Sequence, residues 1–130
     1  MKAGVLKTAL LTALVAVSGC AAGISREELL REMQEGTAPL VVDVRSSREY
    51  DRDHVPGAVH IPFTNISAGV KGLGVRPEER IVIYCEHGPR AGIAYWSLSL
   101  SGYRNIYSLE GHMKGWRAGL FPVETMAHEP

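Results

Sequence analysis

The sequence has little cysteine and no excess of charge of either sign, and both shortages narrow what the protein can be. Lysine and arginine together number 14, as do aspartate and glutamate, so the formal net charge is zero. The sequence contains no basic stripe, low-complexity tract or internal repeat. A nucleic-acid partner is therefore not expected, because binding to phosphates needs a basic surface. The 130 residues suffice for one domain of ordinary size.

No apolar run is long enough to cross a bilayer comfortably, and the longest lies near the N-terminus. Lys2 and Lys7 flank the start of the chain, the apolar segment 8–17 follows, and small residues connect it to Cys20. This order of parts is typical of a secretory signal peptide. An uncleaved membrane anchor or a buried N-terminal helix is the alternative interpretation.

The segment that ends at Cys20 resembles the lipobox of bacterial lipoproteins, since residues 17–20 read VSGC. The resemblance implies that residues 1–20 form a lipoprotein-type signal peptide ending at the lipobox cysteine, and that Cys20 becomes the lipidated N-terminus. The protein would then be exported to the cell envelope and anchored to a membrane there, in the periplasm or on the outer surface. We expect a domain over residues 24–124 and a C-terminal tail over 125–130.

Cys85 is the only cysteine after position 20. If Cys20 carries lipid or is removed, Cys85 has no partner in the chain, and an intramolecular disulfide is excluded. A lone thiol in an oxidising compartment indicates a functional use. The five histidines are scattered and no second cysteine stands at ligand spacing, so no metal site is expected. An inert, buried thiol is the alternative.

Apolar runs alternate with helix-forming segments along the rest of the chain. Strands or extended pieces are predicted over residues 40–44, 59–61, 80–84 and 105–109. Helices are predicted over residues 24–33, 46–51, 90–100 and 111–118, with irregular structure and at most one helical turn over 64–77. This alternation predicts an α/β fold with a mostly parallel sheet, whose ligand site lies beyond the carboxyl ends of the strands.

Cys85 lies between a predicted strand and a predicted helix, which is where an anion binds well. Loop N–H groups and the helix dipole favour negative charge, so we expect Cys85 to lose its proton near neutral pH. Gly88 permits a backbone angle that other residues resist. Arg90 supplies a planar, charged fork suited to an oxyanion, and His87 can donate to an anionic substrate. For Arg90 and His87 the alternative is a solvated position without a ligand.

Three segments in register resemble the rhodanese family of sulfurtransferases. The segment CEHGPR at 85–90 resembles the C-x-x-G-x-R active-site loop of that family. Upstream, VVDVRSSREYDRDHVPGAVHIPF at 41–63 resembles its Asp-Val-Arg, Glu-Tyr and Pro-Gly-Ala signature, and downstream YRNIYSLEGHMKGW at 103–116 resembles its closing strand, glycine turn and tryptophan. The resemblance covers about residues 24–124. It implies a three-layer sandwich with a mostly parallel sheet of about five strands flanked by helices.

The resemblance implies a sulfurtransferase that moves a sulfane sulfur through a persulfide on Cys85. The sulfur would come from thiosulfate or a similar small donor and pass to a thiol or cyanide acceptor. No cofactor is implied, because cysteine itself carries the group, and a monomer is expected. Asp43 and Arg45 match positions that support the loop. The expected substrate-binding residues are Glu86, His87, Gly88, Pro89 and Arg90.

Three positions depart from the family pattern. His112 stands where the family often has a second glycine, and we expect it to line the rim of the site as a supporting residue. Pro89 has no N–H to donate to a persulfide. Glu86 adds negative charge to the loop, and its side chain is expected to point outward into solvent. If it points inward instead, we expect thiosulfate to be a poor donor and a less charged or thiol-based donor to be more natural.

Two other functions stay open. A cysteine phosphatase related to this fold has five residues between cysteine and arginine, whereas four residues separate Cys85 from Arg90 here. The shorter loop favours a sulfur atom over a tetrahedral phosphate. A non-catalytic rhodanese-like binding or redox-sensing module is the second alternative, and the presence of Cys85, Gly88 and Arg90 argues against it.

Overall fold

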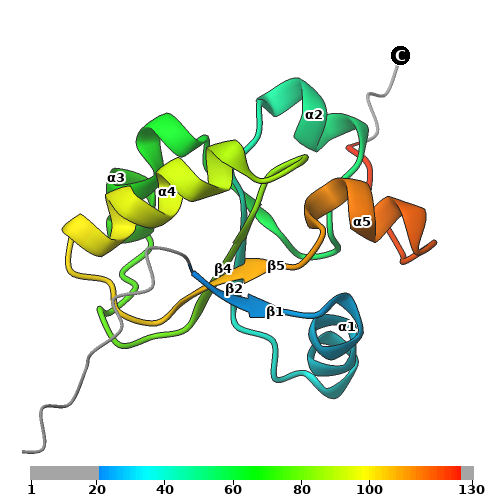
Figure 1. Cartoon of the computed structure of the whole chain (residues 1–130), viewed down its shortest axis with the longest axis horizontal. Helices are drawn as coiled ribbons and strands as arrows, with labels where there is room; N and C mark the ends of the chain where they lie inside the picture. Colours follow the sequence, from blue (N-terminus) through cyan, green and yellow to red (C-terminus); the bar gives the residue numbers. More distant parts are fainter. Residues whose placement is uncertain (1–20, 127–130) are drawn as a thin grey trace, which may run out of the picture.

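The computed structural model describes residues 21–126 (Figure 1). The predicted signal peptide over 1–20, the predicted lipidation of Cys20 and residues 127–130 of the predicted tail therefore lie outside the described residues. Between residues 21 and 126, no helix is both long enough and apolar enough to cross a membrane.

A parallel five-stranded sheet forms the centre of the fold, with spatial order β1-β5-β4-β2-β3. Its strands are β1 (Ala22–Ile24), β2 (Leu40–Asp43), β3 (Val59–His60), β4 (Ile81–Tyr84) and β5 (Ile106–Leu109). The helices are α1 (Arg26–Glu35), α2 (Ser47–Arg52), α3 (Ile66–Gly72), α4 (Pro89–Leu100) and α5 (His112–Ala118), with a 3-10 turn η1 (Phe63–Asn65). The predicted α/β fold with a sheet of about five strands is confirmed.

The central strand β4 and its neighbour β2 are buried on both faces. Val42 and Ile83 pack into the core cluster that contains α3 and α4. Val41 and Val82 point the other way, into the cluster that contains α1 and α5 (Figure 1). Successive strand residues alternate between the two faces, so a strand covered on both sides needs an unbroken apolar run. This is why β2 and β4 could be recognised in the sequence.

Two elements differ from the prediction. The prediction of irregular structure over 64–77 is wrong, because α3 occupies seven of those residues. Ile66 and Val70 lie four positions apart on one face of α3 and are both buried, which stabilises the helix by packing. Strand β1 was not anticipated either. It is only three residues long and is held at the edge of the sheet by parallel pairing with β5.

The parallel sheet brings three distant segments to one edge. Because all the strands run in the same direction, their carboxyl ends lie together. Arg45 follows β2, Cys85 follows β4, and His112 lies just beyond β5. The loop that joins β4 to α4 therefore lies between α2 and α5 (Figure 1).

Candidate active site

Cys85 is a buried free thiol at the end of β4, with 1% of its surface exposed. The N–H of Gly88 donates to Cys85 Sγ at 3.0 Å. Gly88 has φ of 132°, the kind of backbone angle expected for it. Pro89 occupies the first turn of α4, where a backbone N–H has no partner within the helix, so its missing donor costs the helix nothing. The loop thus turns tightly enough to aim an amide at the sulfur.

The surroundings make the thiol of Cys85 more acidic than a free cysteine. Burial raises its pKa, but the neighbouring His112 imidazole and hydrogen bonds from the backbone N–H groups of Ala91 and Gly88 outweigh that effect. The net result lowers the pKa of Cys85 from 9.0 to about 7. A large fraction is therefore thiolate at neutral pH, and the thiolate is the nucleophilic form.

The start of the loop is held by a network of ion pairs around Arg45. The Arg45 guanidinium donates to both carboxylate oxygens of Asp43 and lies 3.2 Å from Oε1 of Glu86. Arg117 from α5 donates to Glu86 and also to Asp53, at 2.8 to 3.1 Å. The Glu86 side chain is only 15% exposed. The expectation that it points into solvent is wrong, because two guanidinium groups hold it against the protein.

The same contacts favour the ionised forms of Glu86 and Asp53. Hydrogen bonds from Arg117 lower the pKa of Glu86 and of Asp53, against burial, which raises both. The charge of Arg45 lowers both pKa values further. The negative charge that Glu86 brings to the loop is therefore offset by two arginines.

The end of the loop is held by a second, separate ion pair. Arg90 donates through both terminal nitrogens to the carboxylate of Glu49, at 2.7 and 2.9 Å. Glu49 also completes a capping box with Ser46 at the start of α2. The guanidinium fork predicted to receive an oxyanion is therefore already occupied by a carboxylate. His87, the other residue expected to donate to substrate, is exposed on the loop.

Helix α5 places His112 against Cys85. Its Nδ1 accepts the backbone N–H of Cys85 at 3.2 Å and lies 4.0 Å from Sγ. The N–H of Met113 donates to the carbonyl of Cys85 at 2.9 Å, which fixes α5 against the loop. His112 has φ of 53°, in the left-handed region that favours glycine. The residue therefore adopts the backbone conformation of the glycine that it replaces.

Three residues that hold the loop were missed by sequence reasoning: Glu49, Asp53 and Arg117. Glu49 carried two local signals, the Ser46–Glu49 spacing of a helix cap and the Glu-Tyr signature, and neither indicates a partner for the loop. Arg117 and Asp53 are 64 positions apart, so no local pattern connects them. Among residues 21–126, no three histidine, cysteine, aspartate or glutamate side chains gather as metal ligands would.

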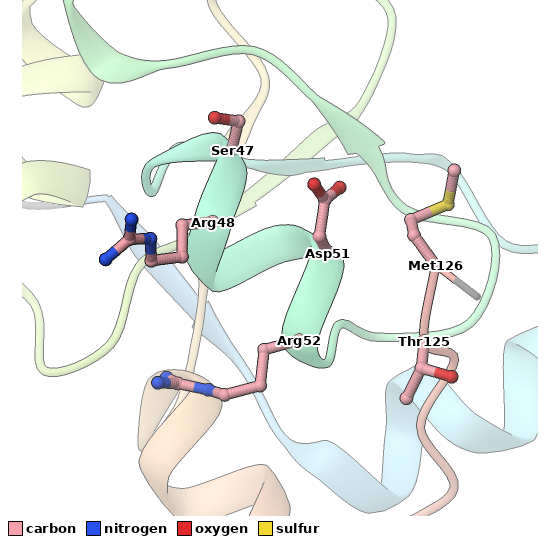
Figure 2. A pocket seen from close by; sticks show the side chains of 6 residues that line it. All are labelled: Ser47, Arg48, Asp51, Arg52, Thr125 and Met126. Carbon is pink, nitrogen blue, oxygen red and sulfur yellow. The ribbon is translucent and has the colours of Figure 1, made fainter. Parts of the chain in front are cut away.

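A hollow of about 500 Å³ on the outer side of α2 is separate from this site. Its lining residues come from α2 and from the segment after α5: Ser47, Arg48, Asp51, Arg52, Thr125 and Met126. The guanidinium groups of Arg48 and Arg52 extend away from Asp51 (Figure 2). None of the lining residues belongs to the 85–90 loop. The candidate active site is thus the tight loop itself, which suits a small reacting group.

Comparison with known proteins gives a consistent result. The model of the Rhodanese-like domain matches residues 25–119. "Thiosulfate sulfurtransferase GlpE" of Pseudomonas fluorescens is 30% identical over 91 residues, 70% of this chain and 81% of that protein. "Probable adenylyltransferase/sulfurtransferase MoeZ" of Mycobacterium tuberculosis is 31% identical over 104 residues, 79% of this chain, which spans only 26% of that protein. The crystal structure of the BH2092 protein from Bacillus halodurans is similar with a TM-score of 0.72 and 26% identity, covering 82% of this chain and 78% of that chain.

Proposed function

The chain belongs to the Rhodanese-like domain family, and from that premise we propose that it is a sulfurtransferase that carries sulfur on Cys85. The observation that carries the proposal is a thiol with pKa about 7 at the carboxyl end of β4, where the Gly88 N–H points at its sulfur. An acidic thiol in a ring of backbone donors suits a nucleophile that becomes an anionic persulfide.

In the proposed reaction, the Cys85 thiolate attacks the outer sulfur of thiosulfate or a similar donor. A new S–S bond forms on Cys85, the S–S bond of the donor breaks, and sulfite leaves with the bonding electron pair. A thiolate or cyanide acceptor then attacks the outer sulfur and releases the Cys85 thiolate. This is covalent catalysis in two displacements, and the charge balances in each step without an external oxidant or reductant.

The loop geometry supports a persulfide as the intermediate. The N–H groups of Gly88 and Ala91 lower the pKa of the thiol by hydrogen bonding to its sulfur, and the same donors favour the negative charge of a persulfide. Four residues separate Cys85 from Arg90, which leaves room for one atom more easily than for a tetrahedral phosphate. With its charge offset by Arg45 and Arg117, Glu86 does not repel an anionic donor as an isolated carboxylate would.

We also propose that the protein is exported and anchored by lipid at Cys20. Ala22 begins β1, and β1 runs parallel to β5, which in turn runs parallel to β4. Ala22, two positions after Cys20 in the sequence, lies at the amino end of the sheet, and Cys85 follows the opposite edge. Such a tether would hold the protein at a membrane while the loop stays accessible to small substrates. Intact mass of the processed protein tests this: loss of residues 1–19 with added acyl chains supports it, and an unmodified Cys20 contradicts it.

The decisive test of the activity is sulfur loading followed by intact mass measurement. Incubation of the purified protein with thiosulfate is expected to add one sulfur atom, which cyanide then removes. The Cys85→Ser variant should gain nothing under the same conditions. If no sulfane donor loads the wild-type protein, the proposal fails, and the result favours a non-catalytic binding or redox-sensing module. Hydrolysis of an aryl phosphate that depends on Cys85 would instead support a phosphatase.

A further inference from the structure

The arginines around the loop are all committed to carboxylates. Arg45 and Arg117 contact Glu86, and Arg90 is bound on both nitrogens by Glu49. Each of these three guanidinium groups already has a carboxylate partner. An anionic sulfur donor that enters this site therefore finds none of the three free to bind it. The oxygens of such a donor still need a hydrogen-bond donor once they leave water.

The hydrogen bond from the Cys85 N–H determines which nitrogen of His112 carries a proton. Nδ1 accepts that N–H at 3.2 Å, and a nitrogen that accepts carries no hydrogen of its own. In the neutral ring the proton therefore lies on Nε2, which makes Nε2 a donor. The main chain of the nucleophile thus orients the imidazole.

The Nε2 atom lies over the loop and has room there because residue 88 is glycine. A Cβ on Gly88 would come within 3.3 Å of Nε2, a contact tighter than normal packing allows. His112 is half-buried, and within the described part of the chain its hydrogen bonds run only through Nδ1. Nε2–H is therefore a donor over the Gly88 loop with no acceptor among residues 21–126.

The backbone of His112 supports the same conclusion independently. Its φ of 53° is unfavourable for a residue with a Cβ, and the neighbouring Gly111, with φ of 78°, shows what this turn prefers. A side chain kept in such a conformation at the edge of a reactive site points to a use for that side chain. The imidazole contact with Cys85 is the use that the geometry offers.

Building on the proposed function, we propose that His112 determines donor specificity. Its Nε2–H binds an oxygen of the anionic head group of the donor, such as the sulfonate oxygen of thiosulfate, and keeps that bond as sulfite leaves. His112 thus binds the anionic head group, as an arginine without a carboxylate partner could do in a loop of this kind. A donor whose leaving group has no oxygen makes no such hydrogen bond, so His112 does not speed its reaction.

The test compares two donors on three forms of the full chain. Rates of sulfur loading on Cys85 are measured with thiosulfate and with an alkyl hydropersulfide, which transfers sulfur but has no oxyanion head group. The His112→Gly variant restores the residue that suits the backbone and removes the ring. The His112→Gln variant retains an amide N–H that reaches about as far as Nε2. Urea unfolding of each form checks that the fold is intact.

The expected readout is the ratio of the two loading rates. In His112→Gly the ratio of thiosulfate to hydropersulfide should fall about tenfold or more, the usual effect of one hydrogen bond to a charged group, and His112→Gln should recover part of it. An unchanged ratio, or an equal loss with both donors, would overturn the proposal and leave His112 a structural residue. If neither donor loads the wild-type protein, the proposed function itself fails and this inference fails with it.

Discussion

The two ends of the Cys85 loop are held by the same kind of contact in different surroundings. At the start, Glu86 joins Arg45, whose side chain is fully buried, and Arg117. At the end, Arg90 joins Glu49 in a single bidentate pair whose members are 32% and 22% exposed. The start is therefore tied to the protein interior through Arg45, with Arg117 at the surface, and the end is a partly hydrated clamp.

This difference shows where the loop gains its rigidity. A buried charge that loses its partner is strongly destabilising, whereas an exposed pair contributes little. The start of the loop is thus tied to the stability of the whole domain, while its end is free to vary at small cost. Both ends use arginine for positioning, and we propose that hydrogen bonding to substrate is left to the loop amides and to His112.

Removing Arg45 should have the largest effect on stability, because it leaves the buried carboxylate of Asp43 without its ion-pair partner. Arg45→Met is expected to lower the free energy of unfolding by about 3–5 kcal/mol, measured by urea denaturation. The matched control is Arg48→Met, an exposed position on α2, which should change stability by less than about 0.5 kcal/mol. Similar losses for both variants would contradict the assignment of the network as the main support.

Glu86→Gln should have the next largest effect, about 1–3 kcal/mol at neutral pH. The lowered pKa of Glu86 means that its ion pairs stabilise the fold fully above its ordinary value of 4.5 and that this stability is lost as the pH falls below it. The difference between wild type and variant, measured by urea unfolding from pH 7 to pH 3, should therefore shrink toward low pH. A difference that stays constant with pH would show that Glu86 does not act through its charge.

Glu49→Gln should cost less, about 1 kcal/mol, because it weakens a partly exposed pair and a helix cap. It also releases Arg90 beside the loop, so sulfur loading from thiosulfate should become severalfold faster. The matched control is Glu79→Gln, which breaks an exposed pair with Arg76 far from the loop and should change neither quantity measurably. Slower loading in Glu49→Gln would mean that the clamp itself is needed for the reaction.

The smallest effect is expected on the ionisation of Cys85. Backbone amides and His112 lower its pKa, so Glu86→Gln and Glu49→Gln should leave it near the wild-type value of about 7. Alkylation of the thiol should speed up as the pH rises through 7 and then level off, since the thiolate is the reactive form. A pKa change of about one unit or more in either variant would show that the ion pairs also tune the nucleophile.

The sequence was most informative where a requirement is local. The apolar runs of β2 and β4, the tight loop with Gly88 and the four-residue spacing to Arg90 could all be read before the fold was known. Segment 64–77 was misread because the residues that stabilise α3, Ile66 and Val70, owe their effect to packing against other elements. Strand β1 was missed for a similar reason, since its hydrogen bonds are made by β5.

The sequence by itself determined the α/β architecture, the place of Cys85 at the end of a strand and the shape of its loop, because these follow from periodicity, chain stiffness and residue spacing. Only the tertiary structure decided which charges meet. Glu86 pairs with arginines 41 and 31 positions away, and His112 reaches Cys85 across 27 positions. Such contacts exist only because parallel strands bring their carboxyl ends to one edge. Two of the residues predicted as substrate ligands, Glu86 and Arg90, pair with charged side chains from elsewhere in the fold.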